Sequence, residues 1–180
     1  VYVGSLTILQ SIMQLTSTPI NGFTQGVQPI LSYNFGAGKL DRVKQAYRRI
    51  IAVTAGFSFL LTALEMMFPK VLARMFTQDE ELIALVGHAA PIFLAGMLIF
   101  GIQMGCQTTF MGLGQAKISL FMALLRKVFL LVPFALIFPM VTGKADSIYF
   151  AECTADALAA TICGTVFALK IRKILKKKIS

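Results

Sequence analysis

Residues 1–38 read VYVGSLTILQSIMQLTSTPINGFTQGVQPILSYNFGAG and contain no charged side chain. The stretch nevertheless holds many amides and hydroxyls: Gln10, Gln14, Thr16, Thr18, Asn21, Thr24, Gln25 and Gln28. A basic block follows at once: Lys39, Arg42, Lys44, Arg48 and Arg49. A segment this long and uncharged is typical of a membrane helix, and its polar groups indicate that one face borders a wet cavity instead of lipid.

The composition of the 180 residues also favours a membrane protein. Hydrophobic residues make up 57% of the chain and charged residues 14%, and the mean hydropathy is +0.76. A soluble domain of this size needs far more charge to cover its surface. The net charge of +9 would suit nucleic acid, but the basic residues gather in short segments between apolar runs. That clustering is a topology pattern, so we expect no nucleic-acid partner.

Nearly charge-free segments predict five transmembrane helices in a single membrane domain, residues 1–180. Their expected bounds are about 3–34, 48–68, 82–113, 118–141 and 147–170. At about 1.5 Å rise per residue, each can cross about 30 Å of hydrocarbon. Pro19 and Pro29 predict a kink or partial unwinding of the first helix, and Pro69 predicts the end of the second. Because the chain opens with Val1 inside a predicted span, we expect it to be part of a longer protein.

The basic residues set the predicted orientation. If the loop after the first helix is cytoplasmic, 14 of the 17 Lys and Arg residues fall on the cytoplasmic side, including Lys117, Arg126 and Lys127. Because Arg126 and Lys127 lie inside the fourth predicted span, their side chains must snorkel or face protein. The tail contributes Lys170, Arg172, Lys173, Lys176, Lys177 and Lys178. The outer loops hold Lys70, Arg74 and Lys144, with Asp79, Glu80, Glu81 and Asp146. The positive-inside rule therefore predicts a cytoplasmic C-terminus.

Glu152 and Asp156 are the only acidic pair within a predicted span, and their i, i+4 spacing places them on one helical face. By helical rise, Asp156 lies on the order of 13 Å beyond Ser147. A charge at such depth costs at least about 2.5 kcal/mol and usually faces a cavity or a partner. Two close carboxylates repel one another, which favours binding of a proton or another cation. We predict a coupling site; a hydrogen-bonded structural pair is the alternative.

Neutral side chains form the second candidate site. Amides recur on the first and third predicted helices, and a methionine adds adaptable apolar surface; the predicted cavity lining is Asn21, Gln25, Gln28, Gln103, Gln107 and Met104. For any one of these residues, an interhelical hydrogen bond worth about 0.6 kcal/mol is the alternative. The pairs Gly22/Gly26 and Gly101/Gly105 have GxxxG spacing, which predicts close helix approach.

Other titratable residues do not predict catalysis. Glu65, one turn before Pro69, is expected at the membrane interface. His88 is the sole histidine, so no metal site and no Ser/His/Asp arrangement is predicted. The three cysteines lack CxxC spacing and are expected to be packing residues. The chain is therefore not expected to be an enzyme.

Residues 19–39, PINGFTQGVQPILSYNFGAGK, resemble the eighth helix and following loop of the multidrug and toxic compound extrusion (MATE) transporters. Residues 110–117, FMGLGQAK, resemble the end of the family's tenth helix. Residues 125–127, LRK, resemble the start of its eleventh helix, and residues 151–156, AECTAD, resemble its acidic twelfth-helix element. The resemblance covers all 180 residues. It implies an all-α integral membrane fold, in which five helices form most of one lobe of a twelve-helix transporter.

The resemblance also implies secondary active multidrug export by alternating access in the bacterial inner membrane. A transmembrane proton or sodium gradient would drive it, with no cofactor. Expected partners are the lipid bilayer, small amphipathic cationic drugs, and the N-terminal lobe with the seventh helix. Gln25 and Gln28 match a cavity-side motif, and Glu152 and Asp156 match the acidic motif. Cys153 stands where proline is common in the family. A proton is favoured because the third helix lacks the acid that some members use for sodium.

Two other functions stay open. A lipid-linked saccharide flippase of the same superfamily would need a basic central cavity, and the first, third and fifth predicted spans carry no deep Lys or Arg. A non-transporting helical membrane scaffold would leave Gln25, Gln103 and Asp156 dry.

Overall fold

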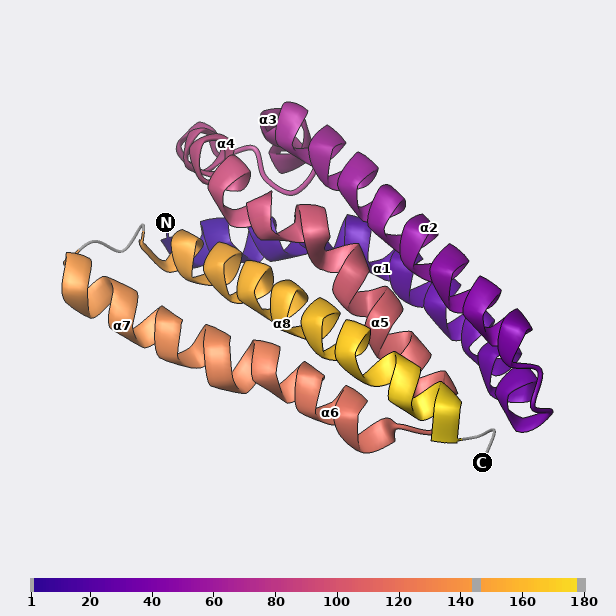
Figure 1. The fold of residues 1–180 in the computed structure, drawn as a ribbon. Coiled ribbons are helices and arrows are strands. Elements are labelled where there is room, and N and C mark those ends of the chain that lie inside the picture. The colour runs from indigo at the N-terminus through magenta and orange to yellow at the C-terminus, as the bar shows by residue number, and fades with distance from the viewer. Residues whose placement is uncertain (1, 144–146, 178–180) are drawn as a thin grey trace.

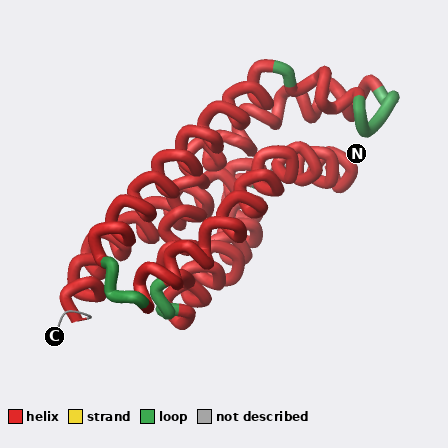
Figure 2. The backbone as a smooth tube through the Cα atoms, turned by 90° about the vertical axis from the view of Figure 1, so that its right-hand side faces the viewer, coloured by secondary structure: helices red, strands yellow, loops and turns green. Residues whose placement is uncertain are grey.

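The computed structural model describes the backbone of residues 2–143 and 147–177, and the side chains of 3–143 and 147–175. Within these residues the chain is helical nearly throughout and contains no strand, which confirms the predicted all-α class. The long helices run side by side as a bundle, and short loops join them at its ends (Figure 1; Figure 2).

The helices follow one another with few connecting residues. α1 (Tyr2–Gly36) and α2 (Leu40–Met67) are neighbours, and the short α3 (Pro69–Arg74) follows. α4 (Glu80–Leu94), the 3-10 helix η1 (Ala95–Ile99) and α5 (Phe100–Gly112) form one continuous stretch. α6 (Ala116–Leu124), the π-helix η2 (Leu125–Leu131) and α7 (Val132–Thr142) form another, and α8 (Ser147–Lys177) completes the bundle. The predicted elements thus occur in the expected order.

Among the described residues, three helical stretches are long and apolar enough to cross a membrane: Leu40–Met67, Glu80–Gly112 and Ala116–Thr142. They correspond to the second, third and fourth predicted spans, so the chain is a multi-pass membrane protein. α1 and α8 have the necessary length but carry more polar side chains. Membrane crossing by these two helices remains a prediction.

The prolines affect α1 and α2 differently. α1 is one helix of 35 residues with Pro19 and Pro29 inside it, so the expected partial unwinding does not occur. Each proline removes a single backbone donor, and a helix held by its neighbours can tolerate that loss. α2 ends at Met67, and Pro69 opens α3, which confirms the predicted end of the second helix.

Glycines set the distance between α5 and α2. A methyl group at Gly101 would collide with the backbone carbonyl of Thr54, and one at Gly105 would come within 3.0 Å of Ile51 Cα. The close approach predicted for this pair is therefore confirmed. Gly22 and Gly26 of α1 have no described neighbour within 4 Å of such a methyl group, so this second GxxxG pair makes no close contact within the described residues.

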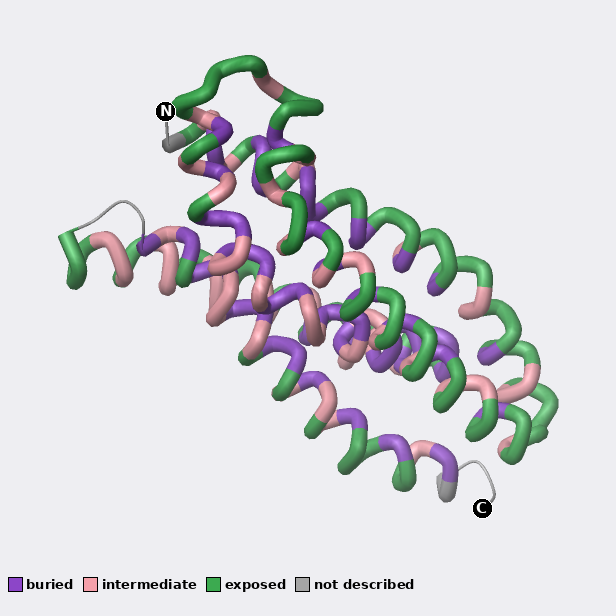
Figure 3. Tube along the Cα trace, turned by 90° about the horizontal axis from the view of Figure 1, so that it is seen from above, coloured by how far each residue is buried: buried purple, intermediate pink, exposed green. Residues whose placement is uncertain are grey.

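α8 lies between α5 and the α6–η2–α7 stretch (Figure 1). Against α5, Phe167 packs on Phe110 at a ring-centroid distance of 5.3 Å, and the Cys163 thiol donates a hydrogen bond to the Gln103 carbonyl oxygen at 3.9 Å. Buried and exposed residues alternate along α8 towards the C-terminus (Figure 3). In the α6–η2–α7 stretch, Ser119 and Met122 are the buried residues. This arrangement places the acidic part of α8 directly opposite η2.

Candidate ion and substrate site

Asp156 of α8 forms a two-point ion pair with Arg126 of η2. Arg126 Nη2 donates to Asp156 Oδ2 at 2.9 Å, and Arg126 Nε donates to Asp156 Oδ1. The Asp156 side chain is 2% exposed and that of Arg126 11%. The guanidinium also lies 4.7 Å from the centroid of the Phe100 ring. A buried bidentate pair with a cation–π contact fixes both side chains in one geometry.

Gly96 of η1 makes room for this pair. A methyl group at Gly96 would come within 2.7 Å of both Asp156 Cβ and the Cys153 carbonyl oxygen. The absence of a side chain at Gly96 therefore lets α8 approach η1 at the level of the carboxylate.

Glu152 faces the neighbouring basic residue of η2. Lys127 Nζ lies 3.6 Å from Glu152 Oε1; the Lys127 side chain is 53% exposed and that of Glu152 7%. The two carboxylates are one helical turn apart on α8, and the π-helical η2 presents two consecutive basic residues to them. π-helical turns occur often at functional sites. Both buried acids of α8 thus have a counter-charge inside the bundle.

Arg126 and Lys127 were counted with the cytoplasmic basic residues, and within the fourth span they were expected to snorkel or to face protein. The structure shows that they face protein: Arg126 is the eleventh residue of the Ala116–Thr142 stretch, about 15 Å along the helix axis. They face α8 in the middle of that stretch because two carboxylates there offset the cost of burying a cation. Two basic residues inside an otherwise apolar span were the available signal that they partner the acids of α8.

A pocket of about 280 Å³ lies beside these ion pairs, between α1, η1, α5, α6 and η2. Four of the six predicted cavity residues line it, namely Asn21, Gln103, Met104 and Gln107. The other lining residues are Met13, Gln14, Ser17, Met97, Phe100, Ala123, Arg126 and Lys127. Gln103 is 2% exposed, and its Oε1 has no hydrogen-bond partner among the described residues.

The pocket wall differs from the prediction in two respects. Gln25 is exposed and Gln28 half-buried, and neither lines this pocket. Their contribution to a cavity stays a prediction. Glu152 and Asp156 also do not line the pocket, because Arg126 and Lys127 lie between them and the space. The lining contains no carboxylate.

Glu65 is buried inside the bundle, while its expected position at the membrane interface stays a prediction. It is 6% exposed, and Thr16 Oγ1 donates to its Oε1 at 2.8 Å. Its position near Pro69 suggested a shallow site, but α1 continues past this end of α2 and covers it. Glu65 is thus a third buried acid, on a different pair of helices.

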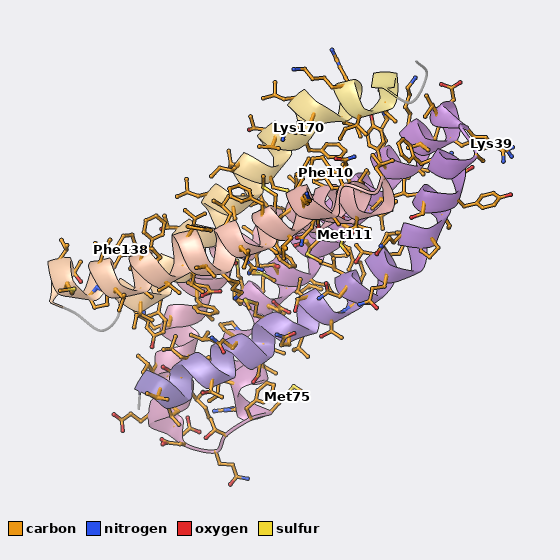
Figure 4. All side chains as sticks on the ribbon, turned by 90° about the horizontal axis from the view of Figure 1, so that it is seen from below. Lys39, Met75, Phe110, Met111, Phe138 and Lys170 are labelled. Carbon is orange, nitrogen blue, oxygen red and sulfur yellow. The ribbon has the colours of Figure 1, made fainter. Side chains whose placement is uncertain are left out.

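One end of the bundle gathers basic residues from distant segments. Figure 4 places Lys39 and Lys170 at this end and Met75 at the opposite end. Lys44, Arg48 and Arg172 line a common pocket there. Lys144, Asp146 and Lys178, which entered the predicted orientation, lie outside the described residues, as do the side chains of Lys176 and Lys177. The clustering agrees with a single basic face, while its cytoplasmic location stays a prediction.

Known proteins share both this sequence pattern and this fold. The protein named Uncharacterized protein MG447 of Mycoplasma genitalium is 28% identical over 172 residues, 92% of this chain and 31% of that protein. Multidrug and toxin extrusion protein 1 of Mus musculus is 24% identical over 119 residues, 66% of this chain and 21% of that protein. The chain thus spans about a third or less of the length of these relatives.

A crystal structure of MATE in the bent conformation superposes with a TM-score of 0.90 at 19% identity, over 99% of this chain and 39% of that one. This likeness demonstrates the fold. The family model MatE matches residues 1–137, well over half of the chain. The chain therefore belongs to the MatE family, whose members are transporters and not enzymes.

Proposed function

We propose that this chain is part of a secondary active multidrug exporter that exchanges a cation for its substrate by alternating access. The observation that carries the proposal is the position of the Asp156–Arg126 and Glu152–Lys127 pairs directly behind the wall of the amide-lined pocket. A proton is the favoured coupling ion over sodium. The proposed setting is the bacterial inner membrane, with a cytoplasmic C-terminus and with the N-terminal lobe and seventh helix opposite this lobe.

The ion pairs can act as the coupling element. While Arg126 and Lys127 cover the carboxylates, the pocket meets no negative charge. When the pairs open, Asp156 and Glu152 become available to the pocket, where a cation from the gradient and a cationic amphipathic substrate would compete for them. Competition for one set of carboxylates produces exchange, because each ligand leaves as the other binds. A ligand shifts the transporter between states only by its different affinity for them.

The polar groups of the pocket suit substrates of varied shape. Gln103 Oε1 is an unpaired acceptor, while Asn21 and Gln107 can donate or accept. Met13, Met97 and Met104 add an adaptable apolar surface. A non-transporting scaffold would have no use for such a lining, so the pocket favours transport over that alternative.

The basic residues of the pocket support a second candidate function, a flippase of lipid-linked saccharides. Arg126 and Lys127 line the pocket, which supplies the basic residues that the first, third and fifth spans lack. Guanidinium and ammonium groups bind phosphate well. A flippase of lipid-linked saccharides would use them for the phosphate of its substrate.

Export of a cationic dye tests the primary proposal. The full-length protein is expressed in an efflux-deficient strain, and dye accumulation is measured for the parent, Glu152→Gln and Asp156→Asn. We expect both variants to accumulate more dye, with Glu81→Gln, an exposed acid, as the matched control. Unchanged export in both variants would show that Glu152 and Asp156 do not couple export to the ion gradient. The same assay separates the candidates, since expression of the parent should lower dye accumulation if the protein exports cationic drugs and should leave it unchanged if the protein is a flippase.

A further inference from the structure

Glu65, Thr62 and Thr16 form a group of buried oxygens that the coupling mechanism does not use. Thr62 and Thr16 are 0% exposed and Glu65 6%. Thr16 Oγ1 of α1 donates to Glu65 Oε1 of α2 at 2.8 Å. Glu65 Oε2 and Thr62 Oγ1 have no hydrogen-bond partner among the described residues. Thr62 and Glu65 are three residues apart on α2, so both lie on the same helical face.

Unpaired buried oxygens are uncommon in folded proteins and point to a missing ligand. The two at this site come from neighbouring positions, and one of them belongs to a carboxylate. A Thr16 hydroxyl already fixes the other carboxylate oxygen. Hard oxygen donors of two helices thus meet at Glu65, and the Thr62 hydroxyl lies on the same face of α2.

The charge of Glu65 has no internal compensation among the described residues. Four other described acids have a basic partner: Asp41 with Lys44, Glu80 with Arg74, Glu152 with Lys127 and Asp156 with Arg126. Asp79 and Glu81 are exposed to solvent. Glu65 is thus the described buried acid without a partner cation, in surroundings where an isolated charge is costly.

The helices packed against α2 do not supply the missing charge. α1, η1 and α5 contain no Asp, Glu, Lys, Arg or His, and their described titratable side chains are the neutral Tyr33 and Cys106. α3 carries Lys70 and Arg74, and α4 carries Glu80, Glu81 and His88; all five are exposed. The counter-charge must therefore come from outside these helices.

The site lies well inside the bundle. Gly4 of α1 is next to Leu82 near the start of α4, and Thr16 follows twelve residues later, about 18 Å farther along the helix axis. The site is enclosed by helices of this chain alone, because Glu65 is buried by the described residues themselves.

We propose that Glu65, Thr62 and Thr16 form a binding site for a monovalent cation, a proton or sodium, between α1 and α2. A single carboxylate neutralises one positive charge, whereas a divalent ion would leave a net charge buried among apolar side chains. The bound ion would satisfy the two unpaired oxygens and hold α1 against α2. The site is separate from the α8 ion pairs and does not depend on the proposed export.

Thermal unfolding of the purified full-length protein in detergent tests the site. In one arm sodium chloride replaces choline chloride at constant ionic strength and alkaline pH; in the other, the pH is lowered without sodium. We expect the unfolding midpoint to rise on the order of 1–3 °C for each tenfold increase of the bound ion. A response in the sodium arm identifies sodium, and a response confined to the acid arm identifies a proton.

Two variants assign the response to these residues. Glu65→Gln keeps an oxygen for the Thr16 hydroxyl, so it should fold, and it should lose more than half of the parent's response. Thr62→Val has nearly the same volume and should move the response to about tenfold higher ion concentration. Glu81→Gln should respond like the parent.

An identical response in the parent and Glu65→Gln, or no response in either arm, would overturn the site. If the unfolding midpoint of Thr62→Val responds to the ion as the parent's does, Thr62 is not part of the site. Because unfolding is measured instead of dye export, these outcomes leave the proposed exporter untouched.

Discussion

The carboxylates of α8 and the carboxylate of α2 are equally buried but are compensated differently. Asp156 and Glu152 face Arg126 and Lys127, which belong to the next helical stretch. Glu65 faces a threonine hydroxyl and no cation among the described residues. Burying a carboxylate is costly in either place. At α8 the basic side chains of the same chain offset that cost. At Glu65 we propose that a reversibly bound ion offsets it.

The largest expected effect comes from breaking the fixed pair. Asp156→Asn should destabilise the protein by about 3–5 kcal/mol, because it leaves the Arg126 guanidinium buried without a partner. Thermal unfolding in detergent measures the loss. The double variant Asp156→Leu with Arg126→Met removes both charges and should recover most of the stability; a double variant as unstable as Asp156→Asn would contradict the compensation argument.

The close approach of η1 to α8 offers the next test. Gly96→Ala should cost about 1–3 kcal/mol, because the added methyl group would overlap Asp156 Cβ and the Cys153 carbonyl. Thermal unfolding again provides the measurement. Gly36→Ala is the matched control, since no described atom lies within 4 Å of its added methyl group. Equal effects of the two changes would show that packing at Asp156 is looser than the structure indicates.

The same acid-to-amide change at the uncompensated site should have the opposite sign. Without sodium and at alkaline pH, Glu65→Gln should stabilise the protein by about 1 kcal/mol, because it removes an unpaired buried charge and keeps the Thr16 hydrogen bond. Urea or thermal unfolding at that pH checks it. A loss as large as that expected for Asp156→Asn would mean that Glu65 has a fixed partner after all.

The smallest effect should come from the exposed half of the α8 pairs. Lys127→Met should cost less than Asp156→Asn, because the Lys127 side chain is 53% exposed and makes a single contact of 3.6 Å with Glu152, so solvent already screens the pair. Raising the salt concentration should shrink even this difference between Lys127→Met and the parent. A loss of stability as large as that of Asp156→Asn would show that Lys127 contributes as much to stability as Arg126.

Local sequence pattern was sufficient for the helices and for their class. The uncharged residues 1–38 predicted a polar helix, and α1 spans Tyr2–Gly36. Pro69 marked the end of α2. These features depend on hydropathy, helical periodicity and backbone geometry, which neighbouring residues determine on their own.

Charge compensation was decided only by the tertiary structure. Arg126 and Asp156 are 30 residues apart, and their pairing depends on how η2 and α8 rotate and approach each other. Glu65 looked shallow by its distance from Pro69, yet its burial depends on α1, whose Thr16 is 49 residues away. Sequence alone identified the acidic pair of α8 and the family. Packing between helices determined which acid has a partner, because the energy of a buried charge depends on what lies across the interface.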